Sequence, residues 1–345
     1  MASDLDSFLA TMVTDSRVPL ARAVAVARER YGFEARAVRL TGERDENFKL
    51  CVADGSAYVL KIANASEEPA VGDLLTAALR HVEKRDPGFP CPRVVPARGG
   101  GSCVRFVDER GVERTARVLT YLPGRLLGAT ARSRAQRAAC GRIAGRLANA
   151  LRGFDHPGAY RAMVWDLRHV SQLHRLLEQL PECPYRPAAA SLLERVVPEI
   201  EERLPRLRQQ VVHNDLNPLN ILVSPADEAC VTGVIDFGDL THTALIADVA
   251  VTAAELLPNE CRATPSACES IREVAGGYHE SVPLQPQERA ALAPLVAARL
   301  VTNLVVQEWH RHRNPAGGHY AALDPAFAGA RLEIARGLLQ EEGAL

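Results

Sequence analysis

The stretch from 211 to 239, VVHNDLNPLNILVSPADEACVTGVIDFGD, sets four acidic or amide side chains against short apolar runs. Asn220 begins the run NILVS and Asp236 ends the run VTGVID, so a hairpin of these runs brings both side chains to one end. An amide oxygen and a carboxylate suit Mg²⁺, which takes its other ligands from water and phosphates. Asp215, on the preceding loop, can accept a proton from an attacking hydroxyl or orient it. The spacing therefore predicts phosphoryl transfer.

A hairpin with solvated turn acids is the alternative interpretation of these residues. It explains each residue alone, since acids and amides are common in turns. It does not explain why a histidine, an aspartate, an asparagine and the sequence Asp-Phe-Gly occur together at these spacings. We therefore favour the catalytic interpretation.

A phosphotransferase also needs a cation for the nucleotide phosphates. Lys61 lies in the apolar strand-like run YVLKI, where a buried lysine requires an acidic partner. Asp73, twelve residues further on within a helical pattern, is the predicted partner. Glu67 and Glu68 are rivals, although acids at these positions suit the first turn of a helix.

The turn before this strand, TGERDENF, lacks a Gly-x-Gly-x-x-Gly phosphate loop and has one glycine, Gly42. Its backbone N–H groups and the Asn47 side chain can still cover phosphates. A plain polar turn fits the same residues equally well.

The elements that must position these residues form two unlike halves. Residues 17–32 have helical spacing, runs 35–41, 47–53 and 56–63 resemble strands, and 68–84 is a predicted helix. A second hairpin follows around Gly111. Beyond Pro123-Gly124 the predicted helices are 132–153, 188–209, 264–281, 286–312 and 327–342. These patterns predict an α+β fold with a small antiparallel β lobe (1–122), a hinge at about 119–124 and a larger helical lobe (125–345).

Composition excludes several classes of protein. The chain has 345 residues, is 47% hydrophobic and 24% charged, and has a net charge of −1 without runs of like charge, which argues against nucleic-acid binding. The N-terminal sequence does not resemble a signal peptide, and no apolar stretch approaches the length of a membrane span. Eight cysteines without a Cys-x-x-Cys pair predict reduced thiols in a cytoplasmic protein rather than a zinc site.

The quoted residues resemble the aminoglycoside phosphotransferase family, a group of kinase-like small-molecule kinases. The resemblance extends from about residue 38 to 250 and rests on LTGERDENFKL, YVLKIAN, RVLTYLPGRLL, HNDLNPLN and IDFGD. Within the family it is strongest to hydroxylysine kinases, and similar domains are fused to class III aminotransferases. It implies a two-lobed protein-kinase-like fold, ATP or GTP as co-substrate and a functional link to a pyridoxal-phosphate-dependent aminotransferase or phospho-lyase.

The resemblance also implies roles for individual residues. Asp215 is the expected catalytic base, and Asn220 and Asp236 are the expected magnesium ligands. Lys61 is expected to contact nucleotide phosphates. The remaining expected roles are backbone contacts to the purine from Thr120, Tyr121 and Leu122, and structural support for the catalytic loop from His213 and Asp248.

The acceptor pocket is expected in the helical lobe, facing Asp215. Tryptophan can cover an aliphatic or cationic group, and an arginine can bind a substrate carboxylate. The same residues also serve as core residues or as internal ion pairs. The candidates are Trp165, Asp166, Asp239, Glu255, Arg299 and the Glu308-Trp309 pair.

Three functions remain open from the sequence. The first is an O-kinase for a small amine-bearing alcohol such as 5-hydroxylysine. The second is a kinase for an aminoglycoside or peptide antibiotic, which would favour a broader acidic rim than the C-terminal helices provide. The third is an inactive kinase-like module that binds a ligand or a partner enzyme.

Overall fold

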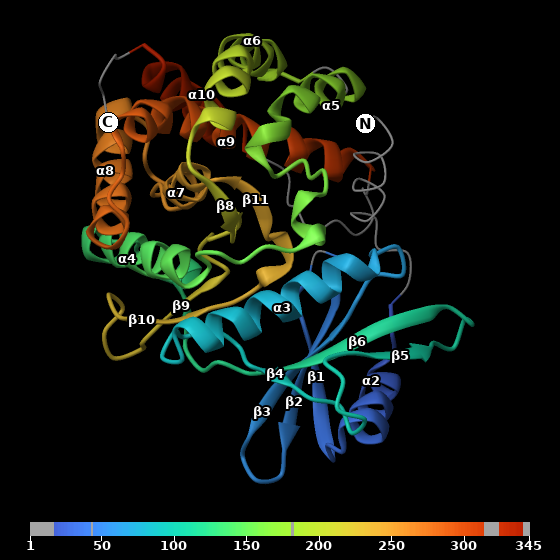
Figure 1. Cartoon of the computed structure of the whole chain (residues 1–345). Helices are drawn as coiled ribbons and strands as arrows, with labels where there is room; N and C mark the ends of the chain where they lie inside the picture. Colours follow the sequence, from blue (N-terminus) through green and yellow to red (C-terminus); the bar gives the residue numbers. More distant parts are fainter. Residues whose placement is uncertain (1–16, 43, 181–182, 314–323, 341–345) are drawn as a thin grey trace.

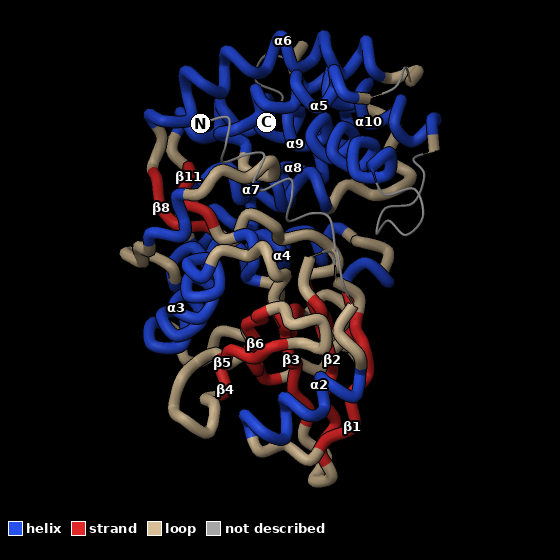
Figure 2. The backbone as a smooth tube through the Cα atoms, turned by 90° about the vertical axis from the view of Figure 1, so that its right-hand side faces the viewer, coloured by secondary structure: helices blue, strands red, loops and turns tan. Residues whose placement is uncertain are grey.

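The computed structural model describes residues 17–42, 44–180, 183–313 and 324–340. Figure 1 shows a small lobe built on an antiparallel sheet and a larger lobe built from helices. Figure 2 shows the same division from the side, with most strands gathered at one end of the molecule. This confirms the predicted two-lobed α+β fold.

The sheet of the small lobe has six strands, in the order β1-β2-β3-β6-β4, and β5 also pairs with β6. Every pair is antiparallel. The predicted hairpin between the second and third strands turns at Gly55, whose φ of 89° favours glycine. The strands are β1 (Ala35–Leu40), β2 (Glu46–Val52), β3 (Ala57–Ile62), β4 (Val94–Val95), β5 (Val104–Val107) and β6 (Glu113–Thr120).

One face of this sheet packs against α2 (Leu20–Val26) and the π-helical turn η1 (Ala27–Tyr31). The side chains of Phe48, Leu60 and Ile62 are fully buried in this small core. Because strand side chains alternate between faces, Asn47 and Lys61 point to the opposite face, and they are register partners across β2 and β3. The sequence pattern thus directs both residues toward the larger lobe.

Helix α3 (Pro69–Arg85) lies between the two lobes in Figure 1. Its buried side chains, among them Leu74, Leu79 and Val82, belong to the core of the larger lobe. The chain leaves the six-stranded sheet at Thr120 and enters another sheet at β7 (Arg125–Leu126), where the sequence places the hinge. The lobe boundary stays a prediction, since α3 packs with the larger lobe.

The larger lobe is mainly helical. Helix α4 begins with the capping box formed by Ser133 and Gln136. It packs closely on α8 (Thr264–Ser281). The approach is so close that a Cβ added at Gly141 would lie 2.0 Å from the Val274 carbonyl oxygen. The helices are η2 (Leu127–Ala129), α4 (Arg134–Ala150), η3 (Pro157–Tyr160), η4 (Leu167–Gln172), α5 (Leu173–Gln179), α6 (Arg186–Arg203), η5 (Leu204–Arg206), η6 (Phe237–Asp239), α7 (Leu245–Glu255), α8 (Thr264–Ser281), α9 (Pro286–Arg313) and α10 (Pro325–Leu338).

Helix α9 is long and apolar enough to cross a membrane, judged by length and composition alone. However, 78% of its apolar 18-residue stretch is buried inside the protein. Its neighbours include α5, α6, α7 and α10. This is the environment of a core helix.

Short strands carry the motif stretch. The predicted hairpin is formed by β9 (Ile221–Val223) and β10 (Val231–Val234), and β9 also pairs with β7. A second pair, β8 (Gln209–Val212) with β11 (Thr241–Ala244), was not predicted. Each of these two strands has only four residues, too few for a period of two to stand out.

Candidate active site

The β9–β10 hairpin brings Asn220 and Asp236 to the same end, as its length predicted. Val234 is the register partner of Ile221, and the Ile235 N–H donates to the Asn220 carbonyl oxygen at 2.9 Å. Asp236 has a φ of 61°, a left-handed conformation that non-glycine residues rarely adopt outside strained functional sites. Both side chains line one hollow of the cleft.

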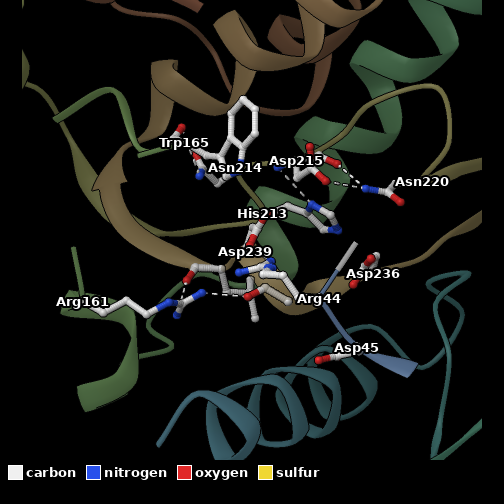
Figure 3. Close-up of polar contacts among 12 residues, drawn as sticks. Arg44, Asp45, Arg161, Trp165, His213, Asn214, Asp215, Asn220, Asp236 and Asp239 are labelled. Carbon is white, nitrogen blue, oxygen red and sulfur yellow. Dashed lines mark hydrogen bonds and ion pairs between the residues drawn. The ribbon is translucent and has the colours of Figure 1, made fainter. Parts of the chain in front are cut away.

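Asp215 is held by two amide groups. Asn220 Nδ2 donates to Asp215 Oδ2 at 2.6 Å and to the Asp215 carbonyl oxygen at 2.9 Å. Figure 3 shows the nitrogen of Asn220 turned toward Asp215, so the amide oxygen is directed away from it. Asn217 Nδ2 donates to Asp215 Oδ1 at 2.9 Å. The Asp215 carboxylate therefore has a fixed orientation.

The surroundings of Asp215 favour its protonated form. Burial raises the pKa of Asp215 well above its ordinary value, and the carboxylate of Asp239 raises it further. The guanidinium of Arg299, with Nη2 at 3.6 Å from Asp215 Oδ1, acts in the opposite direction. A carboxyl group with a raised pKa is a stronger proton acceptor once ionised.

Lys61 is buried and paired with two carboxylates. Its Nζ lies 3.0 Å from Asp236 Oδ1 and 3.6 Å from Asp45 Oδ2. Burial opposes the charge on Lys61, but Asp236 and Asp45 outweigh it and raise the pKa of Lys61. In turn Lys61 lowers the pKa of Asp236 to about 2, so that carboxylate is ionised at neutral pH.

The predicted pairing of Lys61 with Asp73 is wrong. Asp73 is exposed on α3, whose buried positions face the larger lobe. Glu67, one of the two rivals, instead pairs with Arg117 at 3.1 Å. The partners of Lys61 lie in the β1–β2 turn and just after β10. The sequence of the following helix therefore does not indicate them.

A hollow of about 400 Å³ on the α3 side of Lys61 collects further charged residues. Arg44 of the β1–β2 turn forms an ion pair with Asp239 of the larger lobe, so this contact spans the cleft. Arg161 Nη2 donates to the Gly238 carbonyl oxygen at 2.7 Å, and its Nη1 donates to that of Leu240 at 3.0 Å. Figure 3 shows Arg44 and Arg161 on opposite sides of the segment that carries Asp239.

A larger hollow of about 640 Å³ lies between the lobes. Apolar side chains from both lobes line it, including Leu40, Val59 and Leu222, and Lys61 and Asp236 stand on its wall. The predicted hinge residues Thr120, Tyr121 and Leu122 line it as well, and so does Asn47. The Asn47 Oδ1 atom is buried there without a hydrogen-bond partner among the described residues.

A third hollow, of about 390 Å³, lies on the side of Asp215 that faces the helical lobe. We call it the acceptor pocket. Of the predicted acceptor residues, Trp165, Asp239, Glu255 and Arg299 line it. Asp215 lines all three hollows and stands where they meet.

The assignment of Asp166, Trp309 and Glu308 to the acceptor pocket is corrected, because none of them lines it. Asp166 is fully buried and accepts hydrogen bonds from Arg168 and Thr241. The Trp309 indole donates to Gln179 at 2.9 Å, and Glu308 pairs with Arg311. All three have internal structural partners.

Comparison with known proteins agrees with this geometry. A model of the phosphotransferase enzyme family (APH) matches residues 32–267, more than half of the chain. The chain belongs to this family. It is a phosphotransferase that acts on an alcohol group, as the sequence predicted.

Curated relatives cover most of this phosphotransferase. Hydroxylysine kinase of Mus musculus is 27% identical over 326 residues, covering 88% of this chain and 85% of the relative. Hydroxylysine kinase of Bos taurus is 29% identical over 301 residues, covering 81% and 78%.

Solved structures share the fold of this phosphotransferase. An amicoumacin kinase, hAmiN, in complex with AMP-PNP, Ca²⁺ and Ami has a TM-score of 0.69 at 15% identity, and each chain is 92% covered. A microcompartment-associated aminopropanol kinase has a TM-score of 0.64 at 19% identity, covering 92% of this chain and 95% of the other.

His213 and Asp248 form hydrogen bonds with the loop that carries Asp215. The Asp215 N–H approaches His213 Nδ1 at 3.3 Å, and His213 Nε2 lies 3.2 Å from the Ile235 carbonyl oxygen. Burial lowers the pKa of His213 to about 4, which leaves the ring neutral at pH 7. Asp248 accepts from the Asn214 N–H at 2.7 Å, and burial raises its pKa to about 6.

Several residues of the site were not identified from the sequence. Asn217 belongs to the quoted motif HNDLNPLN, and its bond to Asp215 follows the turn geometry of that loop. Arg44 and Asp45 stand in a turn that was considered only for its glycine and Asn47. Arg161 lies far from the motifs in sequence, and no local pattern marks it.

Proposed function

We propose that the chain is an O-kinase for an amino-acid-like alcohol, with 5-hydroxylysine or a close relative as acceptor. It takes the γ-phosphoryl group from ATP or GTP with Mg²⁺. The observation that carries this proposal is the position of Asp215, which lines both the hollow between the lobes and the acceptor pocket. The hydroxylysine kinases among its relatives support the choice of acceptor.

The hollow between the lobes suits a nucleotide. Its apolar walls can enclose a purine, and the segment from Thr120 to Leu122 can read the base through backbone groups. The N–H groups of Thr120 and Tyr121 already donate to the carbonyls of Arg93 and Ala57. A purine would therefore meet the N–H of Leu122 or carbonyl oxygens, since Pro123 has no N–H.

Lys61, Asn220 and Asp236 suit the phosphates and the metal. The carboxylate of Asp236 is ionised, and the amide oxygen of Asn220 is turned away from Asp215. No group of three or more His, Cys, Asp or Glu within the described part of the chain could hold a metal by itself. Two oxygen ligands with phosphates and water fit Mg²⁺, which when bound would neutralise charge on the transferring group. Lys61 would then share the phosphate charge.

The transfer itself requires one proton acceptor. The acceptor hydroxyl lies in the pocket beside Asp215, and its oxygen attacks the γ-phosphorus while its proton passes to the Asp215 carboxylate. The bond to the leaving nucleoside diphosphate breaks as the new P–O bond forms. Asn217 and Asn220 hold the carboxylate in one orientation throughout.

A nucleotide-consumption assay across acceptors tests this proposal. We expect turnover with 5-hydroxylysine or related amino alcohols and little with aminoglycoside or peptide antibiotics. Turnover with an antibiotic alone would identify the enzyme as a resistance kinase. Equal inactivity of the wild type and Asp215→Asn on every acceptor, with nucleotide still bound, would favour a binding module. Competition between ATP and GTP in the same assay identifies the phosphate donor.

We also propose a cytoplasmic location, in keeping with eight cysteines that form no disulfide bond and with dependence on a nucleoside triphosphate. The phosphorylated amino alcohol would be a substrate for elimination or transamination. This chemistry fits the link to a pyridoxal-phosphate-dependent enzyme that the sequence resemblance implied.

A further inference from the structure

Two arginines meet at one carbonyl oxygen in the wall of the acceptor pocket. Arg331, on α10, donates through Nη2 to the carbonyl oxygens of Leu257 at 3.4 Å and Pro258 at 2.9 Å. Arg132, just before α4, donates through Nη1 to the same Leu257 oxygen at 3.1 Å and to Asn259 Oδ1 at 3.3 Å. Both side chains line the pocket that Asp215 also lines. The fold therefore brings two like charges together from distant parts of the chain.

Neither guanidinium forms an ion pair with a carboxylate among the described residues, although the charges of Glu255 and Glu260 are near enough to Arg132 to act against the lowering of its pKa by burial. Arg331 is only 5% exposed, and its Nη1 atom is buried without a hydrogen-bond partner. Its guanidinium carbon lies 4.7 Å from the centre of the Phe327 ring, which positions the group but cannot accept N–H bonds along its edge. Burial, and the nearby charge of Arg132, lower the pKa of Arg331. A buried cation with an unsatisfied N–H is costly unless an anion binds there.

Arg299, the arginine predicted to bind a substrate carboxylate, is engaged elsewhere. Its Nε and Nη2 each lie 3.0 Å from Glu255 Oε1, and its Nη1 donates to the Trp165 carbonyl oxygen at 3.3 Å. Its Nη2 also faces Asp215 at 3.6 Å. An incoming carboxylate would have to displace Glu255, whereas at Arg331 it would supply a missing partner.

We propose that Arg331, assisted by Arg132, binds the carboxylate of an amino-acid acceptor while Asp215 faces the acceptor hydroxyl. This assignment rests on the proposed kinase function and adds the chemical class of the acceptor. A guanidinium binds a carboxylate through two parallel N–H bonds, and a second guanidinium adds charge. A site with an unpaired buried donor also discriminates strongly against ligands that lack the matching acceptor. The pocket thus selects amino acids over simple amino alcohols.

The test compares 5-hydroxylysine with its decarboxylated analogue, 1,5-diaminopentan-2-ol, on the full-length protein. Calorimetry in the presence of a non-hydrolysable nucleotide gives the affinity for each ligand, and a separate nucleotide-consumption assay with ATP or GTP gives turnover. Arg331→Met retains length and apolar volume and removes an unsatisfied buried group, so we expect it to fold. Arg132→Met provides a second variant. Arg336→Met is the matched control, since Arg336 lies on the same helix, pairs with Glu333 and does not line the pocket.

We expect the wild type to bind 5-hydroxylysine at least about 10-fold more tightly than the analogue. Arg331→Met should weaken 5-hydroxylysine binding by about 10- to 100-fold and change analogue binding by less than about 2-fold. Equal wild-type affinity for both ligands, or an equal loss on both, overturns the assignment. So does no binding of either ligand to the wild type.

Binding and turnover separate this assignment from the proposed function. Carboxylate-selective binding that depends on Arg331 but leads to no turnover would retain the carboxylate site and refute the kinase proposal. Turnover of both acceptors without selectivity would support the kinase proposal and refute the carboxylate site. Inorganic phosphate is the third ligand in the titration. If phosphate binds through Arg331 and 5-hydroxylysine does not, the site takes free inorganic anions and the assignment is wrong.

Discussion

Removal of the Arg299 charge is expected to move the acid limb of the pH–rate profile to higher pH. Asp215 must be ionised to accept a proton, so kcat/KM rises as the pH increases through the pKa of Asp215. Burial and the Asp239 carboxylate raise this pKa, and Arg299 opposes them. Arg299→Met therefore raises the pKa of Asp215, and a smaller fraction of the base is ionised at each pH below that value.

The size of this shift follows from the distance between the charges. Arg299 Nη2 lies 3.6 Å from Asp215 Oδ1. Two unit charges about 4 Å apart interact by about 4 kcal/mol at an effective dielectric constant of about 20. Glu255 shares the same guanidinium at 3.0 Å, so we expect about one third to two thirds of this energy to act on Asp215. Activity below the limb should then fall about 10- to 100-fold.

The assay is kcat/KM for the acceptor at saturating nucleotide, measured over roughly pH 5 to 10. Activity of Arg299→Met should recover toward the wild-type value at high pH, and Arg299→Lys, which retains a charge, should leave the limb close to its wild-type position. An equal loss at every pH, with no movement of the limb, would refute the electrostatic role of Arg299. A loss confined to acceptors with a carboxylate would instead support the substrate-binding role that the sequence predicted.

Five further substitutions test the site and its support. Lys61→Met should lower kcat/KM for the nucleotide by about 100-fold or more, whereas exposed Asp73 can become alanine with less than about a 2-fold change in steady-state kinetics. An equally large loss in both variants would support the predicted pairing of Lys61 with Asp73. Asp236→Asn should raise the Mg²⁺ concentration for half-maximal activity about 10-fold or more, and an unchanged magnesium titration would exclude it as a ligand. Gly141→Ala should lower the free energy of unfolding in urea by about 1–3 kcal/mol, because its Cβ would lie 2.0 Å from a backbone oxygen of α8. Gly276→Ala, at a position on α8 with open space around it, should raise the free energy of unfolding by up to about 1 kcal/mol. Equal effects of the two glycine substitutions would contradict the close packing of α4 on α8.

The local part of the site could be predicted from the sequence. Asn220 and Asp236 flank a hairpin, and the length of its strands alone places them together. Lys61 lies between buried Leu60 and Ile62, so alternation along the strand directs it into the cleft. In each case the relevant geometry spans a few residues.

The contacts between distant segments could not be predicted in this way. Helical periodicity indicates that α3 has a buried face, but not that this face packs on the larger lobe and leaves Asp73 exposed. A tryptophan suits a core as well as a pocket, so residue type alone did not separate Trp309 from Trp165. Arg331 reaches the acceptor pocket only because α10 and the segment after α7 fold together.

The rate of phosphoryl transfer by Asp215→Asn tests the central claim most directly. Asparagine preserves the shape of Asp215 but cannot accept the proton from the acceptor hydroxyl. In single-turnover reactions with 5-hydroxylysine, the rate should fall about 100- to 10,000-fold, while the nucleotide Kd changes by less than about 3-fold. A variant that retains more than about one tenth of the wild-type rate would contradict the assignment of Asp215 as the catalytic base.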